Sequence, residues 1–210
     1  NGWDAGSEHP FRPTLGFSPV GAQGEDIGET MENKTREMLA GMPGAYFQAR
    51  GSVTLAMQTA AEHIHQQLLD YNRRAVRGST PVRGSLNIGV IHQNSLYILH
   101  SGETSTYIFS DSGIEKIGGL PTGDGSPGSS AKLDYSFQQL KINKGDFVLF
   151  CAKPLRRWEA EVVDQSIIKT HHQLRRKLVT PTDSNLTAAA VQLVSGKGEI
   201  LPQIILSPGV

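Results

Sequence analysis

The sequence predicts an α+β fold in which two stacked antiparallel sheets form a β-sandwich flanked by helices. Three observations support this prediction. Helical periodicity dominates before Gly78, alternating apolar residues follow it, and turn sequences separate short apolar runs further along. Helices that are grouped before and after the strands, rather than alternating with them, are typical of antiparallel sheets with helices packed on them.

The composition is that of one ordinary globular domain. The chain has 210 residues, of which 38% are hydrophobic and 19% charged, enough for a single good core. Twenty basic and twenty acidic residues give a formal net charge of +0, so no overall field attracts nucleic acid or an anionic membrane. No window reaches the roughly 18 apolar residues of a spanning helix. We therefore expect no nucleic-acid or membrane contact within this chain, and a cytoplasmic location is favoured.

The predicted organisation is an irregular N-terminal arm over residues 1–24 and a single domain over residues 25–210. The arm is rich in Gly and Pro and lacks sustained periodicity, although it can add a short strand. The first residue is Asn1 rather than Met, which is consistent with a piece of a longer protein.

Two helices are predicted in the N-terminal half. The first runs over about residues 26–40, with Gly41 and Pro43 as stop signals. The second begins after a Ser52 cap and ends near the basic pair Arg73 and Arg74. Its apolar positions recur at spacings of three and four, and they are Val53, Met57, Ala60, Ala61, Ile64, Leu68 and Leu69.

Short strands follow. Alternation at Leu86, Ile88 and Val90, the turn "HQNS", and the runs "LYILH", "TSTYIF" and "IEKI" predict an antiparallel meander. Residues 118–130 predict a flexible surface loop, because they are Gly-rich without the spacing of a phosphate loop. The runs "DYSFQQLKI" and "FVLFC" flank a turn at residues 143–146 and predict a hairpin whose second strand is central.

The C-terminal part predicts helix over about residues 155–178 and a last strand over residues 186–194. The single cysteine, Cys151, lies in an apolar run, where we expect a small buried hydrophobe that cannot form an internal disulfide. Redox chemistry is therefore not expected.

Two histidine pairs and an arginine cluster are candidate metal or phosphate sites. His63 and His65 lie two residues apart on a helix and point to nearly opposite sides, so they cannot share a metal ion. The adjacent residues His171 and His172 meet the same objection. The arginines around residues 73–83 are explained by the carbonyl dipoles of a helix end, and a phosphate-holding role stays open. No G-x-S-x-G elbow is present.

Several strings resemble, in order and spacing, those of the type 2C metal-dependent serine/threonine phosphatases. Ser79 and Thr80 follow the long helix, where that family has Gly-Thr-Thr, and residues 102–105 stand in place of its G-D-S-R string. "INKGDFVLFCAKPL" is similar to the strand that ends in S-D-G, and "TDSNLTAAAVQLV" to the D-N-x-T string with its strand. The likeness covers about residues 51–194 and implies a β-sandwich flanked by helices.

The same resemblance implies that metal-ligand positions are degenerate. Lys153 stands where the S-D-G aspartate would be, Ser184 stands at the D-N-x-T aspartate, and Glu103 lies in the G-D-S-R position. Asp183, one residue early, and Asp26, in the nearest string to the family's D-G-x-G-G, are the residual carboxylates. The resemblance therefore implies no catalytic residue, no metal and no cofactor.

The chemistry of lysine supports this interpretation. Two divalent ions about 4 Å apart need several carboxylate oxygens. An ammonium group has three donors and no lone pair, and it repels a unit positive charge 4 Å away by about 4 kcal/mol at an effective dielectric near 20. We therefore expect one of two arrangements: Lys153 occupies the space and charge of a metal ion and pairs with a carboxylate such as Glu103 or Asp183, or Lys153 points to solvent.

Three functional hypotheses follow. The first is a catalytically inactive relative that binds or regulates a protein, including a phosphorylated one. The second is an active metal-dependent phosphatase that uses Mg²⁺ or Mn²⁺ and a displaced ligand set. The third is an unrelated α+β interaction module. The carboxylates available to the second are Asp26, Glu103, Asp124, Asp146 and Asp183.

Overall fold

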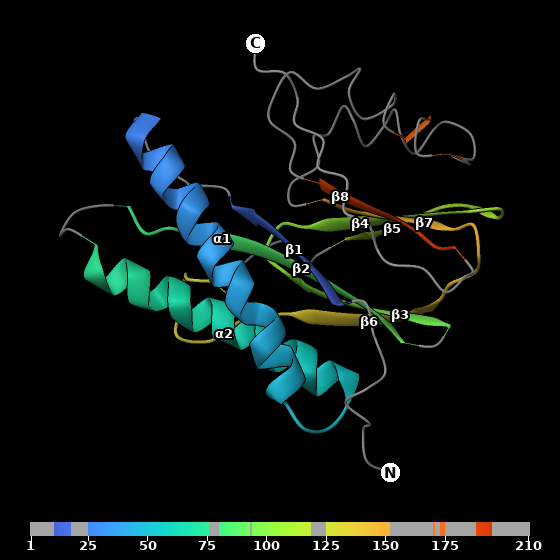
Figure 1. Ribbon diagram of the computed structural model, residues 1–210. Helices are drawn as coiled ribbons and strands as arrows, with labels where there is room; N and C mark the ends of the chain where they lie inside the picture. The colour runs from blue at the N-terminus through green and yellow to red at the C-terminus, as the bar shows by residue number, and fades with distance from the viewer. Residues whose placement is uncertain are drawn as a thin grey trace.

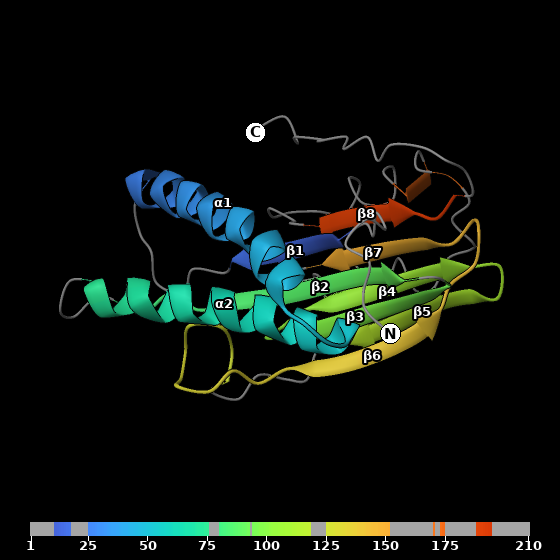
Figure 2. The same ribbon diagram turned by 60° about the horizontal axis from the view of Figure 1, so that its bottom comes forward.

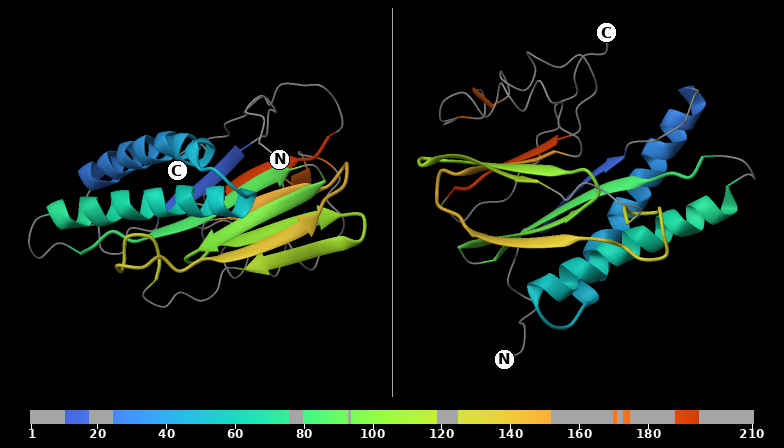
Figure 3. Two further views of the ribbon diagram at one scale, coloured as in Figure 1. Left: turned by 90° about the horizontal axis from the view of Figure 1, so that it is seen from below. Right: turned by 180° about the vertical axis from the view of Figure 1, so that it is seen from behind.

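Two four-stranded antiparallel sheets lie face to face in the computed structural model, and two helices cover the outer face of one sheet (Figure 1). The structure describes residues 11–17, 25–75, 80–92, 94–118, 125–151, 170, 173–174 and 188–194. The two stacked layers are seen from behind in Figure 3. The predicted α+β sandwich is confirmed.

Helix α1, Glu25–Gln48, extends well past its predicted end near Ala40 and passes through Gly41 and Pro43. The predicted end was wrong, because a stripe of side chains four residues apart is buried on this helix. Met38, Met42 and Tyr46 are only 2%, 0% and 5% exposed. Burying three such side chains stabilises the helix by more than the hydrogen bond that Pro43 cannot donate.

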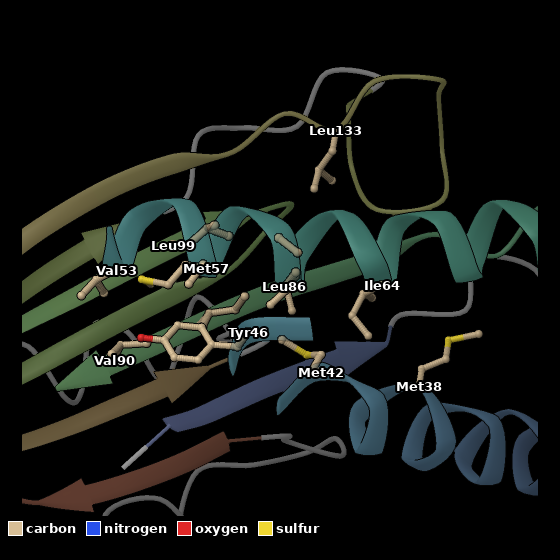
Figure 4. Close-up of a cluster of buried hydrophobic side chains, with 14 of the residues drawn as sticks. Met38, Met42, Tyr46, Val53, Met57, Ile64, Leu86, Val90, Leu99 and Leu133 are labelled. Carbon is tan, nitrogen blue, oxygen red and sulfur yellow. The ribbon is translucent and has the colours of Figure 1, made fainter. Parts of the chain in front are cut away.

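Helix α2, Val53–Arg74, matches its prediction. The Ser52 hydroxyl caps it by accepting a hydrogen bond from the Leu55 N–H at 3.2 Å. Its apolar face lies between α1 and the first sheet (Figure 4), where Met57 and Ile64 lie close to Leu86. The buried residues of α2 therefore lie on one face of the helix, which packs into the core.

The first sheet has the strand order β1-β2-β3-β6. Its strands are β1 Phe11–Phe17, β2 Gly84–His92, β3 Ser95–Ser101 and β6 Ser136–Lys141. Strand β1 comes from the predicted arm and pairs with β2 along its whole length. Leu86, Ile88 and Val90 of β2 contact the helices, while the alternate residues face the second sheet.

The second sheet has the strand order β5-β4-β7-β8. Its strands are β4 Ser105–Ser110, β5 Gly113–Gly118, β7 Phe147–Cys151 and β8 Ala188–Gln192. All five residues of β7 are buried, as predicted for a central strand. Cys151 is fully buried in the outer apolar cluster, which also contains Leu174. The rest of the predicted helical stretch 155–178, apart from residues 170 and 173, lies outside the described residues.

The predicted meander and hairpin were wrong in one respect, because the chain changes sheet three times. It crosses between β3 and β4, between β5 and β6, and between β6 and β7, so none of these consecutive strands are hydrogen-bonded to each other. Both faces of β4 and β7 are apolar, and a strand of this kind is stable when a second layer covers it. Local turn signals cannot distinguish a hairpin from such a crossing. Within the described residues, no helix is long and apolar enough to cross a bilayer.

Candidate site at the mouth of the sandwich

Four described strand ends meet at one end of the sandwich, and Glu103 lies there. Strand β3 ends there at Ser101, and β4 begins there at Ser105. Ser105 is the pairing partner of Cys151, the last residue of β7, which in turn pairs with Ala188, the first residue of β8. We call this end, residues 100–106 with Cys151 and Ala188, the sandwich mouth.

A small polar cluster lies inside the mouth. Asn87 and His100 are directly opposite each other on β2 and β3, and both side chains are buried. Asn87 Nδ2 donates to Thr106 Oγ1 at 2.9 Å, which links the two sheets. His100 Nδ1 is hydrogen-bonded to Thr104 Oγ1 at 2.7 Å. These four polar side chains thus form two hydrogen-bonded pairs, beside the buried hydroxyls of Ser101 and Ser105.

His100 is held neutral by its surroundings. Burial lowers the pKa of His100 from 6.5 to about 4, because the low-dielectric interior disfavours the imidazolium form. Within the described residues, His100 Nε2 and Asn87 Oδ1 have no hydrogen-bond partner. These two buried atoms have unused hydrogen-bonding capacity within the described part of the chain.

A tight turn closes the mouth between the two sheets. Gly102 has a φ of +82°, and a Cβ on it would come within 3.1 Å of the Gly84 carbonyl oxygen. The Thr104 N–H donates to the Gly102 carbonyl at 2.9 Å. Glu103 lies at the tip of this turn and is exposed. The predicted position Glu103 is therefore at the mouth, on its outer side.

Three other predicted positions, Lys153, Ser184 and Asp183, lie outside the described residues. The described residues nearest to them in the chain are Cys151, which ends β7 at the mouth, and Ala188, which begins β8 there. Asp124 is likewise outside the described residues.

The remaining carboxylates are positioned by other elements. Asp26 is in the first turn of α1, and its side chain is not among those described. Asp146 precedes β7 at the end opposite the mouth, where its Oδ2 accepts a hydrogen bond from the Asn143 N–H at 2.7 Å. The structure therefore does not bring Asp146 and Glu103 together.

Residues 125–134, which we call the rim segment, pack beside the mouth. The Pro127 carbonyl accepts from the Gly84 N–H at 2.8 Å where β2 begins. Ser101 Oγ donates to the Asp134 carbonyl at 2.6 Å where β3 ends. Figure 2 shows this segment, in yellow, passing beside α2. The prediction of a flexible surface loop was wrong for residues 125–128, which are buried by these contacts.

Helix α2 holds the rim segment through two polar side chains. Asn72 Nδ2 donates to the carbonyls of Gly128 and Val82 at 2.9 and 2.8 Å, and its Oδ1 accepts from the Val82 N–H at 2.8 Å. His65 Nδ1 accepts from the Gly128 N–H at 3.1 Å. Asn72 and His65 satisfy the backbone of a segment that has no regular secondary structure.

A pocket of about 770 Å³ lies between α1, α2 and the rim segment. Its titratable side chains are those of Glu62, His63, His65, Lys132 and Tyr135. His63 Nε2 is hydrogen-bonded to the Gln67 amide nitrogen at 2.9 Å, whereas His65 contacts Gly128. The two histidines thus have different partners on different flanks of α2.

The phosphatases that the sequence resembles are metal-dependent, and a pair of divalent ions needs several oxygen ligands close together. Among the described residues, no three His, Cys, Asp or Glu side chains lie close enough to hold a metal ion. The described buried polar side chains at the mouth are the Asn87 amide, the His100 imidazole and four hydroxyls, with no carboxylate among them, whereas a pair of hard divalent cations needs several carboxylate oxygens. The described part of the mouth does not fit such ions.

No protein-family model and no curated protein matches the sequence. Solved structures do match the fold. A Streptococcal structure, the S. agalactiae serine/threonine phosphatase, has a TM-score of 0.64 at 10% identity, with 92% of this chain and 91% of that chain covered. The fold is phosphatase 2C-like.

Two further structures share the phosphatase 2C-like fold. PppA, a key regulatory component of T6SS in Pseudomonas aeruginosa, has a TM-score of 0.58 at 16% identity, covering 87% of this chain and 85% of that chain. The catalytic domain of the serine/threonine protein phosphatase PstP, in complex with two manganese ions, has a TM-score of 0.52 at 13% identity, covering 88% and 99%. At these identities the likeness is one of fold.

Sequence reasoning missed the polar cluster and the rim segment. A signal for His100 was present, since this residue ends the apolar run "LYIL", but Asn87 occupies an ordinary polar position in the alternation of Leu86, Ile88 and Val90. The anchoring of the rim had no such signal, because Asn72 and Gly128 are 56 residues apart in the chain.

Proposed function

We propose that this chain is a phosphatase 2C-like domain that does not hydrolyse phosphate esters and that acts by binding or regulating a protein. The polar cluster at the mouth carries this proposal. Where a binuclear site needs carboxylates, the interior offers Asn87, His100, Thr104 and Thr106, hydrogen-bonded in pairs and uncharged at neutral pH. Such a cluster can close the mouth but supplies neither metal ligands nor an activated water.

The sequence on either side of the mouth supports the same conclusion. Lys153 follows the last residue of β7 by two positions, and Ser184 precedes the first residue of β8 by four. A lysine at an aspartate position contributes positive charge where the fold family holds cations, and a serine removes a second negative charge. The degenerate positions are therefore proposed to be Lys153, Ser184 and Glu103.

The alternative of an active phosphatase with displaced ligands is less well supported. Asp146 lies at the opposite end of β7 and is engaged by the Asn143 backbone. Glu103 is exposed on the outer side of the mouth. Two carboxylates separated in this way cannot hold one metal pair, so the described residues do not favour this reading.

Metal titration tests the proposal directly. A ligand that binds only the folded state stabilises it by about 2.7 kcal/mol at one hundred times its Kd. Addition of Mn²⁺ or Mg²⁺ to the chain is expected to leave Tm unchanged and to produce no hydrolysis of an aryl phosphate. A metal-dependent rise in Tm together with hydrolysis would refute the proposal and support the active phosphatase.

A second experiment restores the two aspartates. The double variant Lys153→Asp, Ser184→Asp is expected to gain a rise in Tm with Mn²⁺ that the parent lacks, because it regains two carboxylates at the family positions. The matched control is Lys144→Asp with Ser112→Asp, which adds the same charge at exposed turns away from the mouth. An equal response of both double variants would show that the added charge, and not its position, binds the metal.

The partner is proposed to be a protein that carries a phosphorylated side chain. The similar structures include proteins named as serine/threonine phosphatases, and Lys153 would supply a cation where a phosphate group approaches such a fold. Calorimetric titration should show tighter binding of a phosphoserine peptide than of its unphosphorylated form, with the difference lost in Lys153→Ala. Equal binding of both peptides would exclude phosphate recognition.

A further inference from the structure

His65 of α2 is a buried side chain in contact with the backbone of the rim segment. Its side chain is 1% exposed and projects from α2 toward residues 128–131. Nδ1 accepts the Gly128 N–H at 3.1 Å, so in this arrangement the ring is neutral and carries its proton on Nε2. The carbonyls of Ala131 and Ser130 face the ring, although Nε2 forms no hydrogen bond within the described residues.

Gly128 is the point of closest approach between the rim segment and α2. It has a φ of +80°, and a Cβ on it would come within 2.9 Å of both Leu68 Cβ and the Val82 carbonyl oxygen. Its carbonyl is bound by Asn72, and its N–H by His65. The preceding residue, Pro127, is hydrogen-bonded to the first residue of β2. The adjacent residues Pro127 and Gly128 thus connect the beginning of β2 with α2.

We propose that His65 is a pH-sensitive latch, in which the neutral imidazole holds the rim segment against α2 and protonation releases Gly128 and loosens that side of the sandwich mouth. The reason is the direction of one hydrogen bond. A protonated ring has a donor at Nδ1 as well as at Nε2, so Nδ1–H would face the Gly128 N–H, and two donors repel each other. This latch does not depend on whether the mouth hydrolyses phosphate.

The charges around His65 set the pH range of release. Burial, the largest effect, lowers the pKa of His65 below 6.5. Glu62 on the same helix and the carbonyls of Ala131 and Ser130 act in the opposite direction. Lys132 of the rim segment, His63 and Tyr135 line the same pocket, and among its described residues α1 contributes only Ala45 and Gln48 to it. The Asp134 carboxylate lies against Gly125, at the far end of the segment. Release is therefore expected below pH 6.5.

Amide hydrogen exchange of the full chain, measured by NMR from pH 7.5 to 4.5 and corrected for intrinsic rates, tests the latch. The protection factor of Gly128 should fall by roughly tenfold as His65 titrates, the change expected when one buried donor loses its acceptor. Protection of Ile88, in the middle of β2, serves as the internal reference and should stay constant. A Gly128 protection factor that is constant over this range, or that falls only together with Ile88, would overturn the proposal.

Two variants separate the latch from general effects of acid. His65→Asn keeps an acceptor oxygen near the position of Nδ1 but cannot be protonated, so its Gly128 protection should not change with pH. His63→Gln removes the neighbouring imidazole and should behave as the parent. Loss of the pH dependence in His63→Gln instead would overturn the proposal. If His65→Asn does not fold, the pH midpoints of the His65 ring signals and of Gly128 amide protection are compared in the parent. Different midpoints would overturn the proposal.

Discussion

Gly89 of β2 lies directly against the ring of Phe150 of β7, and this contact joins the two sheets at their centre. A Cβ on Gly89 would come within 2.4 Å of Phe150 Cζ. Real Cβ atoms do not approach other atoms so closely, so the spacing of the sandwich at this point depends on a residue without a side chain.

The first prediction follows from this contact. Gly89→Ala should lower the free energy of unfolding by about 1–3 kcal/mol, because an added methyl group must displace the Phe150 ring or separate the sheets. Urea denaturation measures the change. Gly118→Ala is the control, since a Cβ there meets nothing within 4 Å. Adding Phe150→Leu should recover part of the loss, and equal effects of the two glycine substitutions would contradict this account.

Asn72 provides the second prediction. Asn72→Asp keeps the acceptor for the Val82 N–H but loses both donated hydrogen bonds, so we expect a loss of about 2–3 kcal/mol in the free energy of unfolding. Asp70→Asn, two residues earlier on α2, disrupts only the exposed ion pair with Arg73 and should change stability by less than about 1 kcal/mol. A cost for Asn72→Asp as small as that of Asp70→Asn would show that the rim is not held by this amide.

His100 predicts a dependence of stability on pH. Its pKa falls from 6.5 in the unfolded chain to about 4 in the folded one, so the folded state binds fewer protons. The stability contributed by neutral His100 is therefore present above pH 6.5 and is lost as the pH falls toward 4, by about 3 kcal/mol between pH 7 and pH 4. Denaturation of His100→Asn across this range should show a correspondingly smaller loss. His63→Gln should retain the full loss, and identical pH profiles for His100→Asn and the parent would contradict the assignment.

The glycines of α1 give a matched pair. Gly44→Ala should raise the free energy of unfolding by about 1 kcal/mol, because a Cβ there meets nothing within 4 Å and alanine is the better helix former. Gly41→Ala should gain less, since its Cβ would lie 3.0 Å from His63 Nε2. Thermal unfolding of both variants measures the difference. A larger gain in stability for Gly41→Ala than for Gly44→Ala would contradict the close approach of Gly41 to His63 on α2.

The sequence was most informative where a pattern is local. The period of α2 and the Ser52 cap predicted that helix, and the apolar character of β7 predicted its central position. The end of α1 was misjudged at Pro43, because the burial of Met42 and Tyr46 is a tertiary property that no local signal contains. For the same reason, the turn at residues 143–146 looked like a hairpin although the flanking strands belong to different sheets.

The candidate site was predictable only in part. The order of strings assigned Glu103 to a degenerate ligand position, and the structure shows only that it is exposed in the turn between β3 and β4. The pairing of Asn87 with Thr106 and of His100 with Thr104 depends on how two sheets are stacked. The hydrogen bond between His65 and Gly128 joins residues that are 63 positions apart, and no local pattern in the sequence predicts such a contact.

The three crossings between sheets have a consequence for the order of assembly during folding. Strand β1 is synthesised before both helices but finds its neighbour β2 only after them, and β7 receives β8 only after a long intervening stretch. Neither sheet can therefore be completed from consecutive residues. Loop closure over such separations slows folding, so we expect the local pairs β2–β3 and β4–β5 to form early, with β1 and β8 docking last on their exposed edges.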